Sequence, residues 1–78
     1  MSLRVDMTEL VLDIAQRYIE DHKIGKRELL INVAEDHELL FDDGGIPIWL
    51  KRVVNGVIED IVRIPKEKRE NWEEYLFV

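Results

Sequence analysis

The chain contains no cysteine, which excludes disulfide bonds, catalytic thiols and thiolate metal ligands at once. It also lacks any apolar stretch close to the roughly 20 residues that a membrane-spanning helix requires. The N-terminus shows no basic stretch followed by an apolar run, which is the pattern of a secretory signal peptide. These absences predict a protein that makes no membrane contact and acts in the cytoplasm.

Basic residues are outnumbered, with 11 against 17 acidic residues and a net charge of −6. Such a chain has no global electrostatic attraction to nucleic acid or to anionic membranes. Basic side chains do gather at residues 23–27 and at Lys51 and Arg52, where they would flank a helix-turn-helix. The turn between those groups, residues 42–45, is acidic and would face the phosphates. A helix-turn-helix-like regulator that binds nucleic acid is therefore our alternative function, not our first.

The sequence has no nucleophile elbow and no phosphate-binding glycine loop. Ser2 and Thr8 are the only hydroxyl nucleophiles besides tyrosine, and both lie near the N-terminus. Asp36 and His37 are adjacent, and adjacent positions on a helix do not face a common site. We therefore predict that the protein is not an enzyme and binds no cofactor.

The two histidines do not predict a metal site. His22 and His37 fall on two helices expected to be antiparallel neighbours, and at 1.5 Å per residue they lie more than ~15 Å apart. The acidic strip of residues 35–43 lacks the alternating oxygen ligands of an EF-hand loop. We interpret that strip as a solvated face and predict no metal; the alternative is that the strip binds a divalent cation or a basic partner.

The strongest signal in the sequence is the apolar periodicity of residues 46–62. Apolar side chains recur there at spacings of three, one, three and one: Ile46, Trp49, Leu50, Val53, Val54, Val57, Ile58, Ile61 and Val62. Such spacing collects them on one wide stripe of a helix. The segment 53–61, VVNGVIEDI, also resembles a helix near the C-terminus of NusB-type antitermination factors, and this resemblance implies the helix alone.

The same stretch has a second interpretation. Asn55-Gly56 between two β-branched runs is typical of a type I′ hairpin turn. Neither arm of that hairpin alternates, however, since Lys51-Arg52 and Glu59-Asp60 would place charge on both faces. An α+β fold with a β-hairpin at 46–64 is therefore the alternative to the helix.

Three further helices are predicted, covering residues 7–22, 26–41 and 65–76. Asp6 and Glu9 have the spacing of a capping box at the start of the first helix, and Val5 and Leu10 have that of a hydrophobic staple. The predicted fold is a single all-α domain over residues 1–78, with three main helices and a short C-terminal one.

Apolar residues make up 46% of the chain, which is a high share for so small a domain. A domain of this size buries only about 60% of the surface that its unfolded chain exposes. Large apolar patches are rarely left on a monomer, and two-fold pairing is the commonest way to cover them. We therefore predict a small acidic protein–protein interaction or assembly module that forms a homodimer. The expected interface residues are Trp49, Val53, Val57, Ile61, Trp72 and Phe77.

Overall fold

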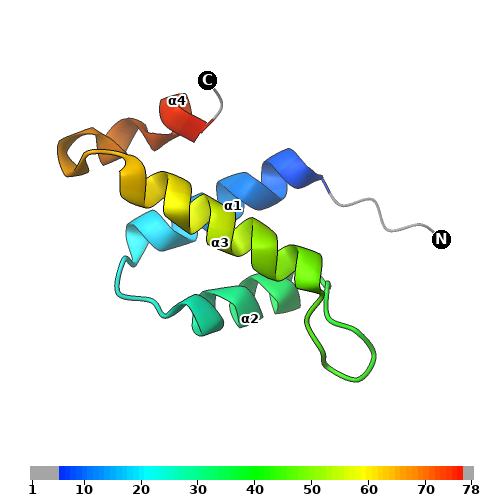
Figure 1. The fold of residues 1–78 in the computed structure, drawn as a ribbon. Coiled ribbons are helices and arrows are strands. Elements are labelled where there is room, and N and C mark those ends of the chain that lie inside the picture. The colour runs from blue at the N-terminus through cyan, green and yellow to red at the C-terminus, as the bar shows by residue number, and fades with distance from the viewer. Residues whose placement is uncertain (1–5, 77–78) are drawn as a thin grey trace.

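The computed structural model describes residues 6–76, which form helices and connecting loops with no strand among them (Figure 1). The elements in chain order are α1 (Met7–Glu20), α2 (Lys26–Asp36), α3 (Ile48–Arg63), the 3₁₀ helix η1 (Lys66–Asn71) and α4 (Trp72–Leu76). The all-α prediction is confirmed. The hairpin alternative is wrong, because Asn55 and Gly56 lie in the middle of α3.

Helix α3 crosses over both α1 and α2 and forms the centre of the molecule (Figure 1). One face of α3 is buried against them, and it carries Leu50, Val54, Val57, Ile58 and Ile61. Trp49 and Val62, which we expected in the same stripe, are 40% and 56% exposed. At about 100° per residue, both lie roughly 100° or more from the centre of the buried face, beyond the reach of the two helices beneath it.

Helix α1 begins as predicted. The Asp6 Oδ1 atom accepts a hydrogen bond from the backbone N–H of Glu9 at 3.2 Å, which satisfies one of the unpaired donors of the first turn. Leu10, Ile14 and Ala15 are buried, whereas Met7 is 45% exposed. Val5, the other half of the expected staple, lies outside the described residues.

Helix α2 ends at Asp36, five residues before the predicted end at residue 41. Glu38 takes a left-handed conformation with φ of 55°, which terminates the helix. The backbone N–H groups of Glu38 and Leu39 donate to the carbonyls of Glu35 at 3.2 Å and Ala34 at 2.8 Å. This is the bond pattern of a Schellman motif, and Leu39 packs against the core, a hydrophobic contact that frequently accompanies the motif.

The early end of α2 leaves residues 37–47 as a loop that projects beyond the helices (Figure 1). The Phe41 N–H donates to the Gly45 carbonyl and the Gly44 N–H donates to the Phe41 carbonyl, each at 2.8 Å. Gly44 has φ of 84°, which the absence of a side chain permits. The Asp43 Oδ1 atom accepts from the Gly45 N–H at 2.8 Å, so the tip of the loop is held by its own hydrogen bonds.

The C-terminal part folds back over the end of α3 (Figure 1). We predicted one short helix there, and the structure divides it into η1 and α4. Trp72 and Leu76 pack against the core, and Ile64 is buried. The Arg69 Nε atom donates to the Ile64 carbonyl at 3.3 Å, which ties η1 to the end of α3.

Candidate functional site

A network of charged side chains joins α1 to the end of α2. The Arg17 Nε atom donates to Asp13 Oδ1 at 3.0 Å, and Arg17 Nη2 donates to Asp36 Oδ2 at 2.5 Å. His37 Nε2 lies 2.7 Å from Asp13 Oδ2. Four residues from two helices are thus connected at the edge of the core.

Two competing effects act on the Asp13 carboxyl. Its partial burial on its own would raise its pKa, but the hydrogen bonds from His37 and then from Arg17 outweigh burial and lower that pKa. The pKa of Arg17 is raised, chiefly by its hydrogen bond to Asp13 and then by the one to Asp36. Both shifts favour the charged forms, so the network stabilises the packing of α1 against the end of α2.

A histidine held by a carboxylate is also half of a general-base arrangement. The only hydroxyl besides tyrosine in the described part of the chain is Thr8, more than one helical turn before Asp13 on α1. Among residues 6–76, no serine or threonine lies within one helical turn of Asp13 on α1. Sequence reasoning missed the pair formed by Asp13 and His37. Only the i,i+4 spacing of Asp13 and Arg17, another bond of the same network, was visible in the sequence.

The acidic strip of residues 35–43 does not form one site. Asp36 pairs with Arg17, and Asp43 accepts from the Gly45 backbone. Within residues 6–76 no three side chains of the metal-binding types come together in a way that would hold an ion. His22 lies at the far end of α1 from this strip, just beyond Glu20.

The predicted interface residues are not brought together on one exposed surface. Val57 and Ile61 are buried in the core of the chain itself, at 5% and 1% exposure. Val53 and Trp72 are half-buried against that core, and Phe77 lies outside the described residues. Trp49 is the one described member that remains exposed.

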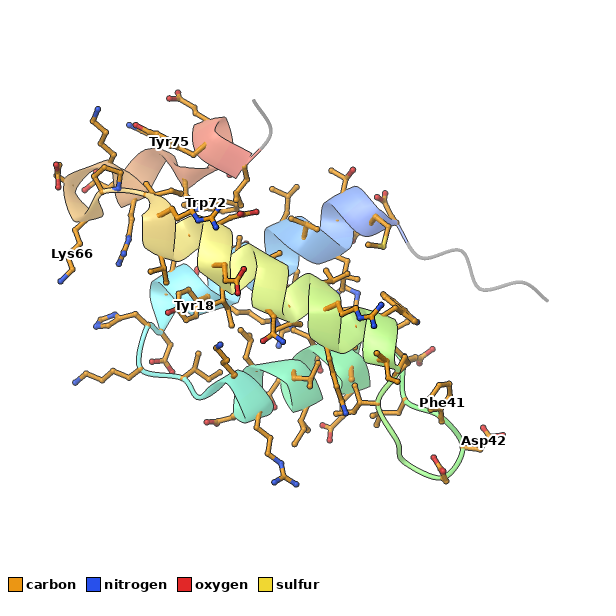
Figure 2. All side chains as sticks on the ribbon, in the orientation of Figure 1. Tyr18, Phe41, Asp42, Lys66, Trp72 and Tyr75 are labelled. Atoms are coloured by element: carbon orange, nitrogen blue, oxygen red, sulfur yellow. The ribbon has the colours of Figure 1, made fainter. Side chains whose placement is uncertain are left out.

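A different set of large apolar side chains is exposed at one end of the molecule. We call this set the end patch, and it consists of Leu40, Phe41, Ile48 and Trp49. Phe41 is 58% exposed and Ile48 is 67% exposed. Leu40 and Phe41 lie in the loop of residues 37–47, and Ile48 and Trp49 begin α3 directly after it, so these residues lie at one end of the bundle, where Figure 2 labels Phe41. Leu40 and Phe41 were not predicted as surface residues from the sequence, because the early end of α2 was not predicted.

A small cleft lies at the opposite end of α3. We call it the C-terminal cleft; it has a volume of about 280 Å³ and is lined by Tyr18, Ile19, His22, Ile61, Lys66 and Arg69. Its residues come from the last turn of α1 and the residues just after it, from α3 and from η1. Figure 2 shows Lys66 at this end and Phe41 and Asp42 at the other.

The connection between α2 and α3 is longer than the short turn of a helix-turn-helix motif. Residues 37–47 separate α2 from α3, whereas that motif joins its two helices through about three to four residues. Lys51 and Arg52 are exposed on α3, and the intervening loop carries Asp42 and Asp43.

None of the described helices has the length and apolar character that crossing a lipid bilayer would demand. No family model, no curated protein and no solved structure matches this chain. The local resemblance of residues 53–61 to a NusB-type helix therefore carries nothing beyond the helix itself.

Proposed function

We propose that the protein is a cytoplasmic protein–protein interaction and assembly module that associates with a second copy of itself through the end patch. The observation that carries this proposal is the exposure of Phe41, Ile48 and Trp49 on a chain whose other exposed surface is mostly charged. Large apolar side chains that gather at one end of a small protein commonly mark an interaction site.

The composition of the end patch supports an interface. Tryptophan and other aromatic residues are enriched at the energetic centres of interfaces, because they bury a large area with little loss of side-chain freedom. Trp49 and Phe41 supply the aromatic groups, and Ile48 and Leu40 surround them with aliphatic surface. Two-fold pairing remains the arrangement that we expect.

The site of association differs from the one that the sequence suggested. Val57 and Ile61 already pack inside the chain, so an interface that includes them would require the core to open. Trp49 is retained from the predicted set, and the loop residues Leu40 and Phe41 join it.

Light scattering on a sizing column tests the proposal. At micromolar concentration we expect a species of twice the 9.3 kDa chain mass, and we expect Trp49→Asp to convert it to a monomer. Val62→Asp is the matched control, because Val62 is also an exposed apolar residue of α3 but lies at its other end. A wild-type monomer, or a dimer that both substitutions weaken equally, would contradict the proposal.

Nucleic-acid binding is tested in parallel by an electrophoretic shift at two salt concentrations. Binding through phosphates weakens steeply as salt rises. We expect no shift at either concentration, because the net charge is −6 and acidic side chains occupy the loop between α2 and α3.

A further inference from the structure

We propose that the C-terminal cleft receives the loop tip, Phe41 and Asp42, of a second copy of this chain. This inference rests on the proposed self-association and names the surface that the end patch contacts.

The cleft has both apolar and cationic residues in its lining. Ile61 is 1% exposed and Ile19 is half-buried, and together they form apolar walls. Lys66 and Arg69 also line the cleft, and within residues 6–76 neither has a carboxylate oxygen within 4.0 Å. A complementary ligand is therefore an apolar group that carries a negative charge beside it.

The size of the cleft favours a side chain over a cofactor. Its volume of about 280 Å³ lies at the lower end of the roughly 300–1,000 Å³ that is typical of small-molecule sites, which suits a small group. One aromatic side chain with its neighbouring residue is a fitting occupant. Tyr18 in the lining offers an aromatic face to such a group.

The loop tip has the required chemistry and is already ordered. Phe41 is 58% exposed, and the next residue is Asp42, which is exposed and forms no hydrogen bond within the described part of the chain. The bonds between Phe41 and Gly44, Phe41 and Gly45, and Asp43 and Gly45 hold the tip in one shape. A preformed tip loses little conformational entropy when it binds.

The occupant belongs to a second molecule. The 16 residues of α3 separate the loop from the cleft by about 24 Å, and Figure 2 shows Asp42 and Lys66 at opposite ends of the molecule. In a two-fold pair each copy inserts its own tip and receives the other, so the contact forms twice. Charge reversal at either partner position then acts on both contacts.

The experiment exchanges the charges across this contact. Lys66→Glu and Asp42→Lys are each expected to weaken the dimer about tenfold, because two attractive pairs become repulsive ones. An equimolar mixture of the two variants is expected to recover the dimer, since every contact then joins opposite charges. Lys68→Glu is the matched control: it makes the same charge change in η1 at an exposed residue outside the cleft, and is expected to leave the dimer unchanged.

The outcomes separate this inference from the proposed function. A dimer that Trp49→Asp dissociates, but that Lys66→Glu and Lys68→Glu weaken equally, would overturn the contact between loop and cleft and retain the self-association. Charge variants that stay dissociated after mixing would overturn it as well. A wild-type chain that is monomeric at all concentrations would overturn both. Circular dichroism of each variant confirms that the helices are intact.

Discussion

The imidazole of His37 and the carboxylate of Asp13 meet at 2.7 Å although the two residues are 24 positions apart in the chain. Asp13 lies on α1, and His37 is the residue that directly follows the last residue of α2. Their contact, together with Arg17 and Asp36, fixes the end of α2 against α1. The loop that carries Phe41 begins directly after this contact, so the network also sets where the loop leaves the bundle.

Removing the charge of Asp13 is expected to cost stability. Asp13→Asn weakens the bonds to Arg17 and His37, and hydrogen bonds to charged groups contribute about 1.5–3 kcal/mol when buried. Because the Asp13 side chain is 28% exposed, we expect a smaller loss of about 1 kcal/mol in the free energy of unfolding. Urea unfolding at pH 7 measures it. Asp60→Asn, at an exposed residue of α3, is the control and is expected to change little.

The same residue predicts a pH dependence. The pKa of Asp13 is lowered in the folded protein, so its stabilisation is fully present above its ordinary value of 3.8. That stabilisation is lost as the pH falls through the lowered pKa of the folded state. The difference in unfolding free energy between wild type and Asp13→Asn should therefore shrink as urea unfolding is repeated at successively lower pH below 3.8. A difference that stays constant or grows towards acid pH would show that the carboxylate is not stabilised by this network.

Replacing Glu38 with glycine is expected to stabilise the fold. Glu38 has φ of 55°, a conformation that costs a residue with a side chain about 1 kcal/mol and costs glycine almost nothing. We expect a gain of about 0.5–1 kcal/mol, measured by thermal or urea unfolding. Glu35→Gly is the control three residues earlier, within α2, where glycine should instead cost about 1 kcal/mol. Equal effects at the two positions would refute the left-handed end of the helix.

Replacing Gly56 with alanine is expected to be neutral or stabilising by up to about 1 kcal/mol. Gly56 lies inside α3, and an added Cβ would meet no atom within 4 Å outside the helix's own backbone. Gly44→Ala provides the contrast, because φ of 84° at that position strains any residue with a side chain. A marked loss of stability in Gly56→Ala would require another surface packed against that side of α3.

Much of this fold could be predicted from the sequence, because its signals are local. The capping spacing of Asp6 and Glu9 marked the start of α1, and the spacing of residues 50–61 marked the buried face of α3. The early end of α2 could not be predicted, because the left-handed turn occurs at Glu38 rather than at a glycine. Burial of Leu39 accompanies that turn and offsets its local cost.

The candidate site was harder to predict than the fold for the same reason. A helix extended to Phe41 would have placed Leu40 and Phe41 against the core, whereas the loop exposes both. The sequence also could not show that Val57 and Ile61 would be buried in the chain's own core. Tertiary packing decides which apolar residues stay exposed and can contact a partner. The local spacing of residues along the chain does not reveal that packing.

Sedimentation equilibrium of the wild-type chain across a wide concentration range distinguishes a self-associating chain from a monomeric one. Self-association through the end patch predicts an average mass that rises with concentration towards twice 9.3 kDa, and a Trp49→Asp variant that stays at 9.3 kDa. A wild-type mass of 9.3 kDa up to the highest concentration at which the chain stays dissolved would contradict the account.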